Sequence, residues 1–170
     1  MKKSGFTLIE LIFVIVIIGL LASFAAPKFM QTRASASSTS AKSIVSSIRT
    51  AIETKHGEWM INDNLGTSDG YTPQGYPIRL DDASLNKGGE KLFDGNSTLP
   101  LLKTPILSCL NNDCWYKAGE DNDKNISYYI YKFNDKDYLT LEYNGSNGKF
   151  DCNASSSGNI NKSQCESIID

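Results

Sequence analysis

The stretch GFTLIELIFVIVIIGLLASFAAP, residues 5–27, decides the fold of this chain. Its clearly polar residues are Thr7, Glu10 and Ser23. An α-helix rises about 1.5 Å per residue, so the stretch reaches roughly 30 Å, the thickness of a bilayer's hydrocarbon core. In lipid each unpaired backbone amide costs several kcal/mol, which favours a helix despite the many β-branched residues. The sequence therefore predicts a transmembrane helix over residues 6–27.

The remainder of the 170-residue chain is polar, and the formal net charge is -2. This length leaves room for one globular domain after an accessory segment. The lysines are scattered and the sequence pI is about 5.4. Because such a chain offers no basic surface that could neutralise many phosphates, we do not expect nucleic acid as a partner.

Glu10 lies inside the apolar stretch, where a carboxylate costs roughly 2.5–3.5 kcal/mol at a helix centre and less near an end. No lysine, arginine or histidine between residues 6 and 26 can pair with it, so a partner would come from elsewhere. Cleavage between Gly5 and Phe6 would create an α-amino group one helical turn before Glu10. In a bundle of apolar helices, that amine and the carboxylate of an axially displaced neighbour would neutralise each other. We interpret Glu10 as a residue that sets assembly register; the alternative is a carboxylate that snorkels to the headgroups.

A cleaved secretory signal peptide is the other interpretation of the N-terminus. Three features disfavour it. The apolar segment is longer than the usual h-region, Glu10 lies within it, and Pro27 follows the small residues that would form the cleavage site.

The stretch KKSGFTLIELIFVIVIIGLLASFAAPKF, residues 2–29, resembles the N-terminus of type IV pilins and of the pseudopilins of type II secretion systems. The resemblance implies that residues 1–5 are a leader, and that a prepilin peptidase cuts after Gly5 and methylates the new amine of Phe6. It assigns the functional glutamate of the family to Glu10. It also implies an inner-membrane precursor with its head in the periplasm, which joins other copies or related subunits in a filament.

Gly19 and Pro27 are the weak points of the predicted helix. Proline lacks an amide donor and clashes with the preceding turn, so we expect a kink or a local opening at Pro27. Glycine costs nearly 1 kcal/mol relative to alanine in a helix interior. The resemblance implies that the helix loosens between these two positions during polymerisation, but close packing in a helix bundle is an equally open role for Gly19.

Residues 28–59 are predicted to continue the helix in amphipathic form. Their apolar residues recur at helical spacing: Ala41, Ile44, Val45, Ile48, Ala51, Ile52 and Trp59. The serine-rich segment TRASASSTSAKS could instead form a flexible tether. No glycine or proline lies between Pro27 and Gly57, which favours a continuous helix with one face docked on a partner.

Residues 60–170 are predicted to form a globular β head. The segments ISYYIYKF from Ile126 and YLTLEY from Tyr138 are rich in β-branched and aromatic residues, and the polar segment NDKD between them indicates a hairpin. Shorter candidate strands are CWYKA at Cys114 and YPIRL at Tyr76. An antiparallel sheet laid on the apolar face of the helix would bury both, so the predicted class is α+β.

All the cysteines lie in this head: Cys109, Cys114, Cys152 and Cys165. An even number beyond a membrane span indicates disulfides in an oxidising compartment. Proximity favours the pairs Cys109–Cys114 and Cys152–Cys165 among the three possible connectivities. Many type IV pilins carry a C-terminal disulfide loop, which the second pair resembles. The spacings do not match a zinc knuckle, so no metal site is predicted at the cysteines.

The segment EDNDKN places Asp121, Asp123 and Asn125 at alternating positions, as at the start of an EF-hand loop. Ile126 replaces the required glycine and Lys132 stands where the bidentate glutamate belongs. We expect a solvated turn and no cofactor, with calcium binding as the alternative.

No catalytic constellation is present in the sequence. His56 is the only histidine, and neither a glycine-rich phosphate loop nor a zinc-protease helix occurs. We therefore expect no enzymatic activity. Two function classes remain: a filament subunit of a pilus or pseudopilus, and a monomeric periplasmic binding domain with a membrane anchor or a secretion signal. An acid inside the span favours the first class, because a simple anchor gains nothing from it.

Overall fold

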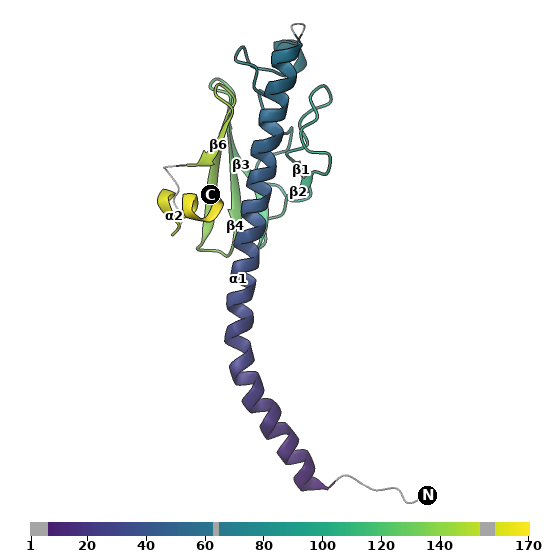
Figure 1. Cartoon of the computed structure of the whole chain (residues 1–170), viewed down its shortest axis with the longest axis vertical. Coiled ribbons are helices and arrows are strands. Elements are labelled where there is room, and N and C mark those ends of the chain that lie inside the picture. The colour runs from purple at the N-terminus through teal and green to yellow at the C-terminus, as the bar shows by residue number, and fades with distance from the viewer. Residues whose placement is uncertain (1–6, 63–64, 154–158) are drawn as a thin grey trace, which may run out of the picture. The chain divides into compact units, whose positions relative to one another are not determined.

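The computed structural model describes residues 7–62, 65–153 and 159–170. The chain divides into an N-terminal unit, residues 1–36, and a C-terminal unit, residues 37–170. Helix α1 (Leu8–Ile61) contributes to both units, and every strand of the described residues lies in the C-terminal unit. Figure 1 shows these elements coloured along the chain. The long helix and the small antiparallel sheet confirm the predicted α+β class.

Helix α1 runs without a break through Pro27 and through the serine-rich segment. The local opening expected at Pro27 therefore does not occur in this structure. A proline inside a helix removes one backbone hydrogen bond, and the bonds of the neighbouring turns can hold the helix together. The alternative of a flexible tether after Pro27 is wrong, because alanine and serine leave the helical conformation accessible there.

Within the C-terminal unit, α1 buries one stripe of side chains: Ser37, Ala41, Val45, Ile48 and Ile52. Its apolar members share one core with aromatic and aliphatic residues of the sheet. In Figure 1 the sheet lies beside this part of α1. Trp59 was expected on the same stripe but is only partly buried. It covers Gly75 instead, where an added Cβ would lie 2.2 Å from the Trp59 ring.

The main sheet has the antiparallel order β3-β4-β5-β6. Its strands are β3 (Cys114–Asp121), β4 (Ile126–Lys132), β5 (Tyr138–Asn144) and β6 (Lys149–Cys152). Alternate residues of β4 and β5 are buried, and Tyr129 pairs with Leu141 across them. This period of two places one face of the sheet on the core. The strands predicted from Cys114, Ile126 and Tyr138 are confirmed.

The strand expected at YPIRL is wrong. The structure has only an isolated bridge there, between Tyr71 and Pro77. Pro77 has no amide hydrogen, so the segment cannot extend a ladder on that side. Tyr143 instead donates its hydroxyl hydrogen to the Pro77 carbonyl oxygen, at 2.6 Å. The segment therefore packs against β5 as a loop.

Several short elements were not predicted. They are the 3₁₀ helix η1 (Thr67–Asp69), the strand pair β1 (Lys91–Leu92) and β2 (Ile106–Leu107), and helix α2 (Lys162–Ile169). Helix α2 starts with a capping box. The Asn161 side chain accepts from Gln164 N–H, and Gln164 Oε1 accepts from Asn161 N–H, each at 3.0 Å. These two hydrogen bonds satisfy amides at the start of the helix that would otherwise lack partners.

Disulfides and ion pairs connect separate segments of the C-terminal unit. Disulfides join Cys109 to Cys114 and Cys152 to Cys165, and the second connects β6 with α2. Arg49 of α1 forms ion pairs with Asp151 at 2.9 Å and with Asp170 at 3.1 Å. Its Nε also donates to the Phe150 carbonyl oxygen at 3.0 Å. The arginine thus ties α1 to β6 and to the C-terminal residue.

Truncation of the α1 stripe should destabilise the C-terminal unit. Ile48 is fully buried, so we expect Ile48→Ala to lower the free energy of unfolding by about 2–5 kcal/mol through lost burial and a residual cavity. The exposed neighbour in Ser46→Ala should change it by less than about 0.5 kcal/mol. Urea unfolding of the detergent-solubilised protein, followed by tryptophan fluorescence, measures both. Equal effects of the two variants would contradict this placement of the stripe.

Removal of the Cys152–Cys165 disulfide, which joins β6 to α2, should also lower the free energy of unfolding. The cysteines of this pair are 13 positions apart, and replacing both by alanine should cost about 3 kcal/mol by the chain-entropy relation. The pair Cys109–Cys114 spans 5 positions, so the same change there should cost less, about 2 kcal/mol. The same urea assay compares them, and four alkylatable thiols in the native protein would refute both bonds.

Candidate functional site

The described part of the N-terminal unit, residues 7–36, buries none of its side chains within its own unit. The exposed fractions of its large apolar residues run from 40% at Ile17 to 77% at Met30. By length and composition α1 could cross a membrane. A helix that is apolar on all sides is stable only in lipid or among other helices. This surface therefore needs apolar surroundings that the unit itself does not supply.

Glu10 forms a capping box with Thr7 at the start of α1. Thr7 donates to Glu10 Oε2 from its amide at 2.9 Å and from its hydroxyl at 2.7 Å. In return the Glu10 amide donates to Thr7 Oγ1 at 3.4 Å. The arrangement satisfies amides of the first turn, and the positive end of the helix dipole favours the carboxylate at this position.

Thr7 of the same chain therefore holds one carboxylate oxygen, while a charged partner for Glu10 from elsewhere stays a prediction. Thr7 was expected only to be a polar residue of the span. The spacing Thr-x-x-Glu before an apolar run is the signal that could have identified it. Among the described residues no group donates a hydrogen bond to Glu10 Oε1. That oxygen has capacity for a further donor.

Of the other predicted residues of the N-terminal unit, the structure describes Gly19 and Pro27. Gly5 and Phe6 lie outside the described residues. Gly19 lies in α1 with no atom within 4 Å of the position a Cβ would occupy, so no contact within the chain requires glycine there. Pro27 lies in the helix interior. The assembly roles of Gly19 and Pro27 stay predictions.

The candidate calcium loop is the turn between β3 and β4. The Asp121 carboxylate lies 2.7 Å from the Lys124 ammonium, and the hydrogen bond from Lys124 lowers the pKa of this partly exposed carboxyl. The described residues contain no cluster of three or more His, Cys, Asp or Glu side chains that could hold a metal ion. The Lys124 ammonium thus occupies the position beside Asp121 that a bound cation would need.

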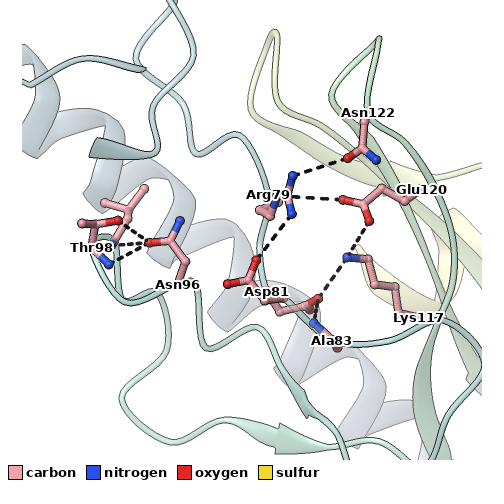
Figure 2. Close-up of polar contacts among 10 residues, drawn as sticks. Arg79, Asp81, Ala83, Asn96, Thr98, Lys117, Glu120 and Asn122 are labelled. Atoms are coloured by element: carbon pink, nitrogen blue, oxygen red, sulfur yellow. Dashed lines mark hydrogen bonds and ion pairs between the residues drawn. The ribbon is translucent and has the colours of Figure 1, made fainter. Parts of the chain in front are cut away.

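A buried ion pair in the C-terminal unit was not predicted. Lys117 of β3 and Asp81 have side chains that are 1% and 0% exposed, and Lys117 Nζ lies 3.4 Å from Asp81 Oδ1. The ammonium also lies 3.3 Å from Glu120 Oε2. Asp81 further accepts the amides of Ala83 and Phe93, at 3.2 Å and 3.0 Å. Figure 2 shows Lys117 between the two carboxylates.

Burial raises the pKa of Asp81, and the Lys117 ammonium and the Phe93 amide act in the opposite direction. Such a pair is favourable only when each remaining hydrogen-bonding group is satisfied, as the two amides satisfy Asp81. The signal in the sequence was the alternation in CWYKA. Trp115 and Lys117 are two positions apart and therefore share the buried face of β3.

His56 has a packing role. Its Nδ1 lies 3.2 Å from the Gly75 carbonyl oxygen, and its ring stacks on Tyr76 with centroids 4.1 Å apart. No nucleophilic side chain accompanies it in these contacts.

Residues 1–26 match the family model described as the prokaryotic N-terminal methylation motif, the signature of type IV pilins and pseudopilins. This confirms the resemblance of the N-terminus. The motif implies processing by a prepilin peptidase and assembly with other pilin subunits, and it points to a structural subunit. Together with the apolar helix, it fits anchoring in the inner membrane. No solved structure matches the chain.

The buried ion pair generates a stability prediction. Lys117→Met leaves the Asp81 charge buried without its partner, so we expect a loss of about 3–5 kcal/mol in the free energy of unfolding at neutral pH. The double variant Lys117→Met with Asp81→Asn removes that charge and keeps an acceptor for a backbone amide. It should therefore be more stable than the single variant in urea unfolding.

The pH dependence separates charge from packing. Without Lys117, burial holds the folded-state pKa of Asp81 above its unfolded value. The contribution of Asp81 to the free energy of unfolding is then fully present below its pKa in the unfolded chain. It is lost as the pH rises through its pKa in the folded protein. The deficit of Lys117→Met should thus shrink between pH 7 and about pH 4, near the ordinary range of a carboxyl. An equal deficit at both pH values would mean that lost packing, not charge, destabilises the variant.

Proposed function

We propose that this chain is a structural subunit of a type IV pilus-like filament or of a type II secretion pseudopilus. It is made as a prepilin whose leader, residues 1–5, is removed by cleavage after Gly5, and Phe6 is then methylated. Residues 6–27 hold the precursor in the inner membrane and later pack in the filament core. Residues 28–59 support the head, residues 60–170, on the periplasmic side.

The observation that carries the proposal is the coincidence of the methylation motif with an unburied apolar helix. Residues 1–26 carry the motif, and the apolar side chains that follow Thr7 are exposed on all sides of α1. A bilayer covers such a surface before assembly, and the equivalent helices of neighbouring subunits can cover it afterwards. One helix thus serves the anchored and the assembled state.

The contacts of Glu10 suggest how register is set. Thr7 holds Oε2 at the helix start, which leaves Oε1 to accept from the N-terminal amine of an axially displaced neighbour. A subunit one step out of place would leave both charges unpaired in apolar surroundings, at a cost of several kcal/mol. The disulfides of the C-terminal unit agree with a periplasmic head, since that compartment is oxidising.

Substitution of Glu10 tests the proposal. We expect Glu10→Ala to insert into the membrane normally and to be recovered in sheared filaments at least about tenfold less than wild type, the effect of losing some 1.4 kcal/mol of pairing per subunit. Thr7→Val should reduce recovery less, because it removes only the hydroxyl that holds the carboxylate. Glu53→Ala, which removes an exposed carboxylate elsewhere on α1, is the matched control.

The readouts are the ratio of filament to membrane-bound subunit and the mass of the N-terminal peptide. Recovery of Glu10→Ala at the level of Glu53→Ala would remove the pairing mechanism. A mature chain that still begins at Met1, or that begins after Ala25, would refute the prepilin assignment. A processed wild-type chain that stays monomeric would instead favour an anchored binding domain.

A further inference from the structure

The C-terminal unit carries a repeated sequence pattern that the proposed function does not use. Asn96 lies in DGNST, residues 94–98. Asn-x-Ser/Thr is the acceptor sequence for N-linked glycans in exported proteins. An acid precedes the asparagine by two positions here and also in DKNIS (123–127), EYNGS (142–146) and DCNAS (151–155), but not in NINKS (159–163). In the fourth of these, residues 154–155 lie outside the described residues, and we place no site there.

This recurrence is not explained by composition. Asp and Glu account for 19 of the 170 residues, yet an acid occupies the same position in all but one of the acceptor sequences. A fixed anionic group two residues before the asparagine gives a transferase a charge to recognise, beside the carboxamide and the hydroxyl.

We propose that Asn96 is an acceptor for an N-linked glycan, transferred by an oligosaccharyltransferase from a lipid-linked saccharide diphosphate. The proposal rests on the export of the C-terminal unit that the proposed function requires. In the transfer, Asn96 Nδ2 forms a bond to the anomeric carbon of the saccharide. The bond from that carbon to the diphosphate oxygen breaks, the lipid diphosphate leaves with the electron pair, and one Nδ2 proton passes to a base of the transferase.

The geometry of the loop presents the reacting groups together. Asn96 Oδ1 accepts from the Thr98 hydroxyl at 2.8 Å, from the Thr98 amide at 2.9 Å and from the Leu99 amide at 2.7 Å. Figure 2 shows the carboxamide oxygen turned toward Thr98, with the nitrogen on the opposite side. Among the described residues, none accepts a hydrogen bond from Asn96 Nδ2. Within the part of the chain that the structure describes, this nitrogen therefore makes no hydrogen bond.

The loop is open to solvent at the acceptor sequence. Asn96 is partly exposed, and Ser97 and Thr98 are exposed. Gly70 lies beside the carboxamide, and a Cβ on it would lie 3.0 Å from Asn96 Nδ2, so a glycine there keeps this side of the nitrogen free of a side chain. Gly95, at φ +76, lies tightly against the Leu99 carbonyl oxygen, since an added Cβ would lie 2.0 Å from that oxygen.

The other described acceptor sequences fit less well. Ser127 is 2% exposed within β4, so its hydroxyl cannot reach an enzyme while the sheet is folded, which makes Asn125 an internal control. Among the described residues, Asn144 Oδ1 accepts one hydrogen bond, from the Ser146 amide at 2.9 Å. The intervening Gly145 packs tightly, with the Pro77 carbonyl oxygen 3.0 Å from the position of a Cβ. Sequence and geometry therefore agree best at Asn96.

The test uses the full-length chain purified from membranes of the organism that encodes it. Trypsin should release residues 92–103, which contain Asn96, separately from residues 125–132, which contain Asn125. We expect the first peptide to carry a saccharide mass that the second lacks. Asn96→Gln and Thr98→Val should abolish this mass, whereas Thr98→Ser and the matched control Asn111→Gln should retain it. Asp94→Asn should reduce the modified fraction.

An unmodified 92–103 peptide overturns the proposal, as does a saccharide mass that persists in Thr98→Val. The N-terminal peptide of the same sample reports on the proposed function independently. A chain that starts at methylated Phe6 with an unmodified Asn96 would refute the glycan and keep the filament subunit. A chain that starts at Met1 with a modified Asn96 would refute the prepilin assignment and support the glycan.

Discussion

The structure depends on one constraint: the apolar side chains of the first half of α1 have no place to be buried in their own unit. The same helix, further along, supplies the central stripe of the folded core, from Ala41 to Ile52. One continuous element therefore meets two different requirements along its length. The N-terminal part exposes apolar side chains that need apolar surroundings, while the C-terminal part buries its stripe in the core that it shares with the sheet. Glu10 lies in the first turn of the apolar part, and its contacts with Thr7 satisfy part of the hydrogen-bonding capacity of the carboxylate.

The features that could be predicted from the sequence are those with a clear period. Helical spacing from Ala41 to Ile52 predicted the docked face of α1, and alternation predicted the strands from Ile126 and Tyr138. The motif around Gly5 predicted the family signature that residues 1–26 carry. The features that were missed depend on contacts between distant segments or on short range geometry. Two-residue strands such as Lys91–Leu92 have no period, and helix α2 depends on its cap at Asn161 and on the disulfide from Cys165. The strand expected at Tyr76 failed because Pro77 lacks a donor.

The buried pair of Lys117 and Asp81 shows the limit of local patterns: the alternation in CWYKA indicates that Lys117 shares the buried face with Trp115, but it does not identify Asp81 as the partner. A lysine in a strand normally indicates the solvent face. Here its acidic partner lies far away in the sequence, and two backbone amides complete the shell around Asp81. A buried ion pair contributes little net stability, but it penalises any packing that separates the two charges. It fixes the loop that holds Asp81 against β3 in one arrangement.

The continuity of α1 also has a mechanical consequence. No loop interrupts the helix between Leu8 and Ile61, so a pull on the chain before Ser37 is carried by helical backbone to the segment that holds the stripe from Ala41 to Ile52. This stripe shares its core with residues of the sheet, and Arg49 is linked to Asp151 and Asp170. The contacts that resist unfolding under such a pull are therefore those that hold α1 within the C-terminal unit.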